Sequence, residues 1–287
     1  MRAAESWKDY ELIDASSGNR LERWGSYLLV RPDPQVIWNT PQNDPGWENA
    51  DAVYHRSSSG GGSWEYRNRL PEEWTVEWNG LKLIVTPTNF KHTGVFPEQA
   101  ANWKIYEELI GSAGRDIRVL NLFGYTGAAS LACMRAGAFV CHVDASKGMV
   151  AQAKRNAALN GLSDRPCRWI VDDCMKFVLR EARRGNRYDA VIMDPPSYGR
   201  GPSGEIWKYE DDISDLVNAC TDILSDDPLF FALNSYTTGI SPSASGYLLS
   251  CAMSGYPGEV SADEIGLTVT ATGFALPCGS TSIYTKR

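Results

Sequence analysis

The sequence predicts an α/β fold in which seven mostly parallel strands form a Rossmann-like sheet, preceded by a small β-rich domain. From about residue 98 onward, short apolar segments alternate regularly with amphipathic helical periods. Such alternation is typical of a parallel sheet covered by helices on both faces. The first ninety residues differ, because they contain few helical periods and several turn signals. We therefore expect a β-rich domain at 1–90 and an α/β domain at 91–287.

Length and composition are those of an ordinary globular chain. Of the 287 residues, 43% are hydrophobic and 22% are charged, which excludes wholesale disorder and a fibrous repeat. No apolar run is long enough to cross a membrane, and the first seven residues lack the apolar core of a secretory signal. We expect a cytoplasmic protein without membrane contact.

Charge and metal-ligand content narrow the classes of partner. The chain has 35 Asp and Glu against 28 Lys and Arg, and the net charge of −7 disfavours a broad phosphate-binding surface. The seven cysteines are scattered without CxxC pairs, and the three histidines lack the spacing of metal ligands. We therefore predict reduced cysteines, mostly in the core, and no metal site.

Short strands and turns are expected in the first ninety residues. The segments 74–78 and 81–85 flank Asn79-Gly80, whose residues both tolerate positive φ, so a hairpin is predicted there. Two further strands are expected near 52–56 and 64–68, joined by a Ser- and Gly-rich loop at 57–63. Most of the tryptophans lie in this part of the chain, where aromatic residues either build a small core or line a ligand face.

Strands and helices alternate through the remainder of the chain. Apolar strands are predicted at 117–123, 139–143, 168–171, 188–193 and 229–233. Helices are predicted at 128–136, 146–159, 175–182 and 213–224. The segments 266–272 and 280–285 alternate like strands without an intervening helix, which indicates an antiparallel edge.

Chemistry is expected where these strands end, because ligands of an open parallel sheet bind outside the carboxyl ends of its strands. Gly124-Tyr125-Thr126-Gly127 follows the first strand, and Asp144 follows the second. Asp172 and Asp173 follow the third, and Asp194-Pro195-Pro196-Ser197-Tyr198 follows the fourth. Each feature alone has a structural explanation, since glycines suit such turns and acids cap helices. Four such features in succession favour a binding site.

The arrangement suits a nucleoside ligand. The glycines let the backbone approach a ligand closely, and a carboxylate at 144 can accept both hydroxyls of a ribose. The carboxylates at 172 and 173 can hold an exocyclic amine such as that of adenine. A dinucleotide-binding turn would follow the pattern GxGxxG, and the third glycine spacing is missing. A ligand with adenosine but no phosphate fits better, and S-adenosylmethionine is such a ligand.

Three segments together resemble a known enzyme family. Val119 to Gly127, His142 to Lys147 and Asp194 to Tyr198, in this order, are similar to class I S-adenosylmethionine-dependent methyltransferases of the bacterial large-subunit ribosomal RNA type. The similarity extends from about His92 to Arg287. It implies the class I methyltransferase fold, S-adenosylmethionine as the cofactor and RNA, specifically ribosomal RNA, as the partner.

The resemblance also implies roles for individual residues. The methionine part of the cofactor would lie against Asn121, Phe123, Gly124, Tyr125, Thr126 and Gly127. The ribose would bind Asp144, beside Ala145 and Ser146, and the adenine would contact Asp172, Asp173 and Cys174. The stretch Thr93 to Gln99 resembles a family segment that closes over the cofactor, which implies cofactor contacts for Phe96 and Gln99.

The segment from Asp194 to Tyr198 is the predicted catalytic element. Two prolines fix the backbone and lack N–H donors, so the segment presents rigid carbonyls and a carboxylate as acceptors for an amine. Tyr198 offers a face on which a planar base can stack. We therefore assign catalysis to Asp194, Pro195, Pro196 and Tyr198, the structural alternative being a proline-rich turn with a packed tyrosine. The glycine-rich stretch 199–204 is expected to be a loop that orders when substrate binds.

The sequence predicts the identity of the methyl acceptor less narrowly than that of the cofactor. Methylation at C5 of cytosine requires a cysteine thiolate, which some relatives carry after the fifth strand, but residues 234–238 read Asn-Ser-Tyr-Thr-Thr. Cys174 follows two carboxylates and Cys220 lies on an apolar helix stripe, so another acceptor atom such as nitrogen is favoured. The leading hypothesis is direct methylation of an RNA base. Alternatives are methylation of a protein side chain or a small molecule, and a catalytically inactive nucleoside-binding module. The oligomeric state is not predicted.

Overall fold

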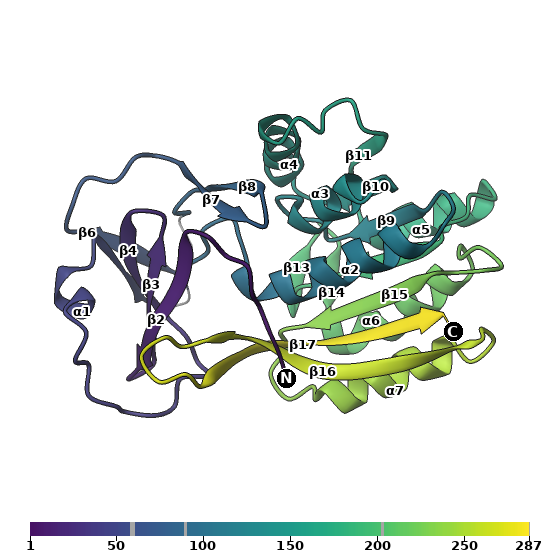
Figure 1. Ribbon diagram of the computed structural model, residues 1–287. Helices are drawn as coiled ribbons and strands as arrows, with labels where there is room; N and C mark the ends of the chain where they lie inside the picture. Colours follow the sequence, from purple (N-terminus) through teal and green to yellow (C-terminus); the bar gives the residue numbers. More distant parts are fainter. Residues whose placement is uncertain (58–60, 89–90, 202–203, 287) are drawn as a thin grey trace. The chain divides into compact units, whose positions relative to one another are not determined.

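The chain divides into two compact units (Figure 1). The computed structural model describes residues 1–57, 61–88, 91–201 and 204–286. The first unit comprises Met1–Ala101 and Ile265–Cys278, and the second comprises Asn102–Glu264 and Gly279–Arg287. This division lies after Ala101, whereas the predicted domain boundary lies between residues 90 and 91. Residue 90, and residues 58–60 of the predicted loop, are outside the described residues.

The first unit is rich in β-strands, as predicted. Its larger sheet has the strand order β2-β3-β4-β5-β6. These strands are β2 (Tyr10–Ser16), β3 (Asn19–Trp24), β4 (Tyr27–Pro32), β5 (Ala52–Arg56) and β6 (Gly62–Tyr66), with α1 (Gly46–Asn49) before β5. The predicted hairpin is confirmed as β7 (Trp74–Trp78) and β8 (Leu81–Val85), and the φ angles of Asn79 and Gly80 are 45° and 82°. The unit also holds β1 (Arg2–Ala3) and the short 3₁₀ helix η1 (Pro97–Gln99).

The interior of this unit combines tryptophans with an ionic cluster. Trp24 and Trp78 are fully buried, which favours the core interpretation for these two residues. Glu22 is also fully buried and accepts hydrogen bonds from Arg31 Nε at 2.6 Å, from Arg31 Nη2 at 2.8 Å and from the Tyr10 hydroxyl at 2.8 Å. Strands β2, β3 and β4 were not predicted, because charged residues occupy positions that a strand pattern would reserve for apolar side chains.

The second unit contains the predicted succession of strands and helices. The predicted elements are β9 (Arg118–Leu122), α3 (Ala128–Arg135), β10 (Phe139–Asp144), α4 (Lys147–Leu159), β11 (Cys167–Val171), α5 (Cys174–Arg183), β12 (Ala190–Met193), α6 (Tyr209–Thr221) and β15 (Phe230–Ser235). Four further elements were not predicted: α2 (Ala100–Ser112), whose first two residues belong to the first unit, β13 (Tyr198–Arg200), β14 (Ile206–Lys208) and α7 (Pro242–Ala252). The strands β16 (Gly258–Thr268) and β17 (Ala275–Lys286) complete the chain and belong partly to each unit.

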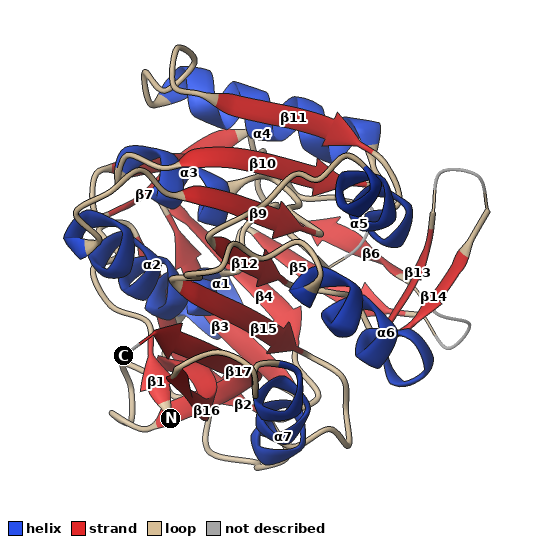
Figure 2. Ribbon diagram, turned by 90° about the vertical axis from the view of Figure 1, so that its right-hand side faces the viewer, coloured by secondary structure: helices blue, strands red, loops and turns tan. Residues whose placement is uncertain are grey.

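The main sheet confirms the predicted fold class. Its strand order is β1-β16-β17-β15-β12-β9-β10-β11. Strands β9, β10, β11, β12 and β15 pair in parallel, and β17 pairs antiparallel with β15, as expected for the edge (Figure 2). Among the described residues the sheet has eight strands instead of the predicted seven, because the two-residue β1 adds to the edge beside β16.

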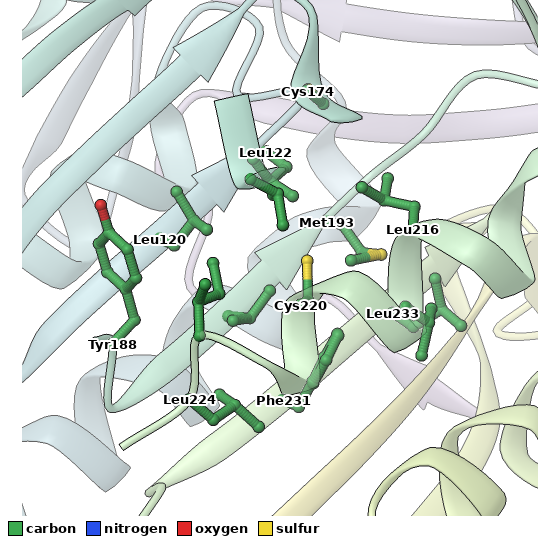
Figure 3. Close-up of a cluster of buried hydrophobic side chains, with 14 of the residues drawn as sticks. Leu120, Leu122, Cys174, Tyr188, Met193, Leu216, Cys220, Leu224, Phe231 and Leu233 are labelled. Atoms are coloured by element: carbon green, nitrogen blue, oxygen red, sulfur yellow. The ribbon is translucent and has the colours of Figure 1, made fainter. Parts of the chain in front are cut away.

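Helices cover both faces of this sheet. Leu120, Val191 and Leu233 belong to a core cluster with apolar residues of α5, α6 and α7 (Figure 3). Phe230 is adjacent to Phe231 of that cluster and therefore faces the other side of its strand. There its ring stacks on Tyr106 of α2, with the centroids 5.2 Å apart. In the part of the chain that the structure describes, no helix is long and apolar enough to cross a membrane.

The topology sets the position of the site. From β9 the chain proceeds to β10 and β11 on one side, and then returns to β12 and β15 on the other side. Ligands of such sheets bind where the strand order reverses, outside the carboxyl ends of the strands. The loops that follow β9 and β12 lie at this point.

Candidate functional site

The turn after β9 has a backbone that leaves no room for a side chain at Gly124. A Cβ there would lie 2.4 Å from Cε1 of His142. Phe123 and Tyr125 have φ of 55° and 50°, and Gly127, with φ of 89°, begins α3. The chain therefore turns tightly across the end of β9, as the two glycines predicted.

Asp144 holds this turn against the loop that follows β10. Its Oδ2 accepts a hydrogen bond from the Tyr125 N–H at 2.9 Å, and its Oδ1 accepts from the Ser146 N–H at 2.8 Å. The side chain is half-buried, and this burial raises its pKa, although both hydrogen bonds oppose the shift. Ala145 is half-buried and Ser146 is exposed, where it caps α4 by accepting from the Met149 N–H. Each carboxylate oxygen keeps a second lone pair, which suits the hydroxyls of a ribose.

Asn121 and Thr126 lie inside the unit. The Asn121 amide is 2% exposed and donates to Ser130 Oγ at 2.8 Å, and that hydroxyl lies 3.0 Å from Nδ1 of His142. Burial lowers the pKa of His142 to about 4, so this imidazole is neutral near pH 7. The Thr126 carbonyl accepts a hydrogen bond from the Asn156 amide at 2.9 Å. These contacts tie β9, α3, β10 and α4 together and support the turn; a direct cofactor contact for Asn121 or Thr126 stays a prediction.

The residues after β11 have structural partners. Asp173 caps α5 by accepting from the Lys176 N–H at 2.9 Å, and Asp172 forms an ion pair with Arg180. The Asp172 N–H donates to the Asp144 carbonyl at 3.1 Å, which places the two loops side by side. Cys174 is 4% exposed and belongs to the apolar core (Figure 3). The adenine contacts assigned to these three residues remain predictions.

The predicted catalytic segment follows β12 directly. Asp194 is half-buried, Pro195 is buried, and Pro196 is exposed. The Ser197 carbonyl accepts a hydrogen bond from the Tyr209 N–H at 3.0 Å, and the Ser197 hydroxyl lies 2.9 Å from that of Thr237 after β15. Backbone and side-chain contacts thus hold the segment at the ends of β12 and β15.

Tyr198 begins a short hairpin instead of a loop. It is 53% exposed and belongs to β13, which pairs antiparallel with β14. The predicted loop at 199–204 therefore begins as a strand at 199–200, and residues 202 and 203 of that loop are outside the described part of the chain. Because the tyrosine is exposed, its ring is available to stack on a base.

Trp207 is a site residue that the sequence analysis did not identify. Its indole Nε1–H donates to the Pro196 carbonyl at 2.7 Å, and its ring lies 5.0 Å from that of Phe123, centroid to centroid. One side chain thereby joins the turn after β9 to the segment after β12. The Ile206-Trp207-Lys208 alternation was the available signal, but three residues are too few to indicate a strand.

Phe96 and Gln99 belong to the first unit. Phe96 precedes η1, its ring centroid lies 5.3 Å from that of His92, and its carbonyl accepts from the Gln99 N–H at 3.1 Å. Gln99 is 5% exposed. These contacts lie within the first unit, and the cofactor role of the two residues stays a prediction.

The described residues offer no group of three or more His, Cys, Asp or Glu side chains that could hold a metal ion. Polar contacts at the carboxyl ends of the strands come instead from carboxylates and from backbone groups. Such donors and acceptors suit a nucleoside and a planar amine.

Comparison with known proteins agrees with this geometry. A crystal structure of an S-adenosylmethionine-dependent methyltransferase from Agrobacterium tumefaciens superposes with a TM-score of 0.94 and 37% identity, covering 99% of this chain and 93% of that one. The ribosomal RNA large subunit methyltransferase K/L of Shewanella baltica is 33% identical over 153 residues, or 53% of this chain and 20% of that protein. The ribosomal RNA large subunit methyltransferase I of Aeromonas salmonicida is 32% identical over 124 residues, or 43% of this chain and 30% of that protein.

The matched part of the chain thus spans about a fifth to a third of these two ribosomal RNA methyltransferases. A family model described as S-adenosylmethionine-dependent methyltransferase matches residues 50–219, which include all four strand ends and their motifs. The resemblance seen in the three motifs is confirmed. This chain belongs to the S-adenosylmethionine-dependent methyltransferase family.

Proposed function

We propose that this protein transfers a methyl group from S-adenosylmethionine to a nitrogen of an RNA base, with ribosomal RNA as the substrate. The observation that carries the proposal is that Trp207 connects the turn after β9 to the segment after β12. Its hydrogen bond to the Pro196 carbonyl and its ring contact with Phe123 hold the acceptor segment beside the cofactor turn. A methyl donor on one loop and an amine on the other would then meet in a fixed geometry.

Each residue of the site would contribute through position. S-Adenosylmethionine would supply a methyl group bound to a sulfonium sulfur. The amine lone pair would attack this carbon as the carbon–sulfur bond breaks, S-adenosylhomocysteine would leave as a neutral thioether, and the amine would release its proton to water, so no strong base is required. The Asp144 carboxylate would accept the ribose hydroxyls, since two backbone N–H groups already fix its orientation. Asp194 and the Pro195 and Pro196 carbonyls would accept the N–H groups of the amine and direct its lone pair. Tyr198 would stack on the base.

The choice of nitrogen over C5 of cytosine follows from the cysteines. Residues 234–238, at the end of β15 and beyond it, contain none. Cys174 and Cys220 are 4% and 0% exposed, and burial raises the pKa of both thiols well above the ordinary value. A thiolate able to add to a pyrimidine would therefore not form at either residue.

Support for RNA comes from the relatives and from the site. The two curated relatives described above act on ribosomal RNA by name. The net charge of −7 opposes a broad electrostatic surface, but aromatic stacking binds single-stranded bases with less charge. A ribosomal substrate would also agree with the cytoplasmic location predicted from the sequence.

Labelled methyl transfer tests the proposal. RNA, protein and metabolite fractions would be taken from cells that lack the protein, so that the unmodified acceptor is present, and incubated with the enzyme and labelled S-adenosylmethionine. We expect label in RNA at one nucleotide, and mass spectrometry of the nucleosides to identify an N-methylated base. Release of 5-methylcytidine would contradict the nitrogen assignment.

A catalytic variant completes this test. Asp194→Ala removes the carboxylate acceptor, and we expect roughly a hundredfold or greater loss of turnover, with S-adenosylhomocysteine affinity close to wild type. If the correctly folded variant has unchanged turnover, Asp194 has no role in catalysis.

The acidic net charge favours a second candidate. A protein side-chain amide or a small planar amine could bind the same acceptor segment without a phosphate-binding surface. Label in the protein or metabolite fraction would identify this class. Cofactor binding without transfer to any fraction would indicate a nucleoside-binding module.

A further inference from the structure

The hairpin formed by β13 and β14 has two chemically different faces. Its register pairs Tyr198 with Lys208, Gly199 with Trp207 and Arg200 with Ile206. Directly paired residues of an antiparallel ladder share a face, and residues two apart along a strand share it as well. Tyr198, Arg200, Ile206 and Lys208 therefore form one face, which we call the outer hairpin face. Gly199 and Trp207 form the other.

Exposure agrees with this alternation. All four residues of the outer hairpin face are exposed, and Tyr198 and Ile206 are 53% and 58% exposed. Gly199 and Trp207 are partly buried, and the Trp207 indole contacts Phe123 and Pro196. The inner face is thus anchored on the site, while the outer face presents an aromatic ring, an aliphatic side chain and two cations to solvent.

The two cations on this face can take new partners. Arg200 forms no ion pair with any residue in the described ranges. Lys208 lies 3.2 Å from Asp211, but both side chains are more than half exposed, and such pairs contribute little. Glu205, the nearest acid within the hairpin, is paired with Lys176.

We propose that the outer hairpin face binds the nucleotide next to the acceptor nucleotide in a single-stranded RNA. Arg200 and Lys208 would contact the phosphates, and Ile206 would pack on the neighbouring base. Tyr198 lies at the start of this face and is separated from the Asp-Pro-Pro segment by Ser197 alone, so an RNA strand whose acceptor base stacks on Tyr198 would continue onto it. The inference rests on the proposed function, and it adds a recognition surface for the flanking nucleotide.

Charge complementarity favours RNA over a peptide as the occupant. Single-stranded nucleic-acid sites combine cations that follow the backbone with apolar side chains that contact the bases. The outer hairpin face has both features within three residue pairs. It needs no sequence-specific hydrogen bonds, so the predicted recognition tolerates different neighbouring bases.

Fluorescence anisotropy tests the proposal without requiring turnover. The probe is a fluorescein-labelled single-stranded RNA of about twelve nucleotides and mixed sequence, added to the full chain saturated with S-adenosylhomocysteine. The double variant Arg200→Gln with Lys208→Gln should bind roughly tenfold more weakly at moderate salt. Its plot of log affinity against log salt should become shallower by about 0.7 for each lost phosphate contact. Ile206→Ser should weaken binding roughly threefold or more without changing this slope.

Two control variants lie near the β11 edge of the main sheet, to which the hairpin does not belong. Arg165→Gln removes an exposed cation from the loop before β11, and Leu159→Ser removes an exposed apolar side chain at the end of α4. Both should bind the probe within twofold of wild type. Calorimetric affinity for S-adenosylhomocysteine should be equal in all variants, which verifies that the site is folded.

The outcomes separate this inference from the proposed function. If the hairpin variants weaken RNA binding and the control variants do not, the outer hairpin face is an RNA-binding surface. This conclusion holds even if the labelled methyl group is found in another molecule. If RNA is methylated but all variants bind the probe with equal affinity, the RNA-binding role of the outer hairpin face is wrong. The proposed function is then unaffected. A wild-type protein that binds a basic or acidic peptide, but not the RNA, overturns both.

Discussion

Asp144 shows how one side chain can hold two loops together and, in the proposed function, also bind the cofactor. Its two oxygens accept backbone N–H groups from the loops after β9 and β10, and it remains half-buried. The carboxylate therefore needs no further residue to orient it toward a ribose. Replacement of either oxygen disturbs the loop and the proposed ligand contact together.

We predict that Asp144→Asn lowers affinity for S-adenosylhomocysteine roughly ten- to a hundredfold, because an NH₂ group replaces one of the two charged acceptors. Isothermal titration calorimetry provides the measurement. Asp164→Asn is the matched control, since Asp164 is exposed in the loop before β11. Equal affinities in the two variants would contradict the role given to Asp144.

The same carboxylate predicts a pH dependence. Burial raises the pKa of Asp144, so protonation begins at a higher pH than for an exposed aspartate. Protonation removes the charge that accepts the ribose hydroxyls. Cofactor affinity should therefore decline as pH falls toward this raised pKa. An Asp144→Asn enzyme should lack that part of the profile.

Trp207 provides a separable test of the acceptor segment. Trp207→Phe keeps an aromatic ring against Phe123 but removes the donor to the Pro196 carbonyl. We expect kcat to fall roughly three- to tenfold, as for one lost hydrogen bond, with KM for S-adenosylmethionine changed by less than about twofold. Trp38→Phe is the control, because Trp38 donates a comparable hydrogen bond, 2.7 Å long, to the Ala15 carbonyl in the first unit. Equal kcat for both variants would leave Trp207 with a packing role alone.

Among the elements, the turn between β9 and α3 leaves no room for a side chain at its first glycine. A Cβ at Gly124 would meet the His142 ring, which is itself held by Ser130. We predict that Gly124→Ala abolishes measurable cofactor binding or lowers it at least about tenfold, since buried polar groups must shift. Gly111→Ala in α2 is the control: nothing lies within 4 Å of that added Cβ, and alanine is the better helix former. Thermal melts of both variants would separate folding from binding.

The elements also show which features a sequence can predict. The β7–β8 hairpin and the strands β9 to β12 were recognisable because their signals are local: an Asn-Gly turn, or a short apolar run ending at an acid or a glycine. Local signals of this kind also identified the Gly124 turn, Asp144 and the Asp-Pro-Pro segment in the sequence. Seven strands were expected in the main sheet, and only the two-residue β1 was added.

Features that depend on distant partners were not predictable. Glu22 and Arg31 look like surface residues in the sequence, but each is buried because the other is present. The cofactor contact predicted for Asn121 stays a prediction, but the hydrogen bond from its amide to Ser130 could not be foreseen. Trp207 gains its role only when β14 pairs with β13 and carries the indole to Pro196. Local propensity contains none of this information.

For the molecule as a whole, the ionic cluster of the first unit should control stability in acid. Burial alone would raise the pKa of Glu22, but Arg20 and Arg31 outweigh it and bring the pKa down from the ordinary 4.5 to about 2. A lowered carboxyl pKa contributes stability above the unfolded value, and this contribution is lost as pH falls from about 4.5 toward 2. Tryptophan fluorescence, with Trp24 and Trp78 as buried reporters, should reveal unfolding of this unit in that range.

We predict that Glu22→Gln lowers the free energy of unfolding by about 3–5 kcal/mol near pH 7, because Arg31 is left buried without its charge partner. Glu11→Gln is the matched control in the same sheet, on the neighbouring pair of strands. It removes a pair with Arg23, 3.0 Å apart, in which both side chains are about one-third exposed, and it should cost at most about 1 kcal/mol. Urea titrations measure both, and similar values would contradict the importance of the buried pair.

The first unit is built from two segments that lie far apart in the sequence, so it cannot be completed until the second segment has been synthesised. Residues 265–278 return to strands formed by much earlier residues: Thr270 and Ala271 donate to the carbonyls of Leu12 and Ile13 at 2.9 Å, and Ala4 donates to that of Gly266. During translation, the segment Met1–Ala101 therefore has to wait until residues 265–278 are synthesised before these hydrogen bonds can form. Nascent chains that stall after Tyr198 would already contain the loops that follow β9 and β12. Their first unit would be incomplete, because residues 265–278 would be missing.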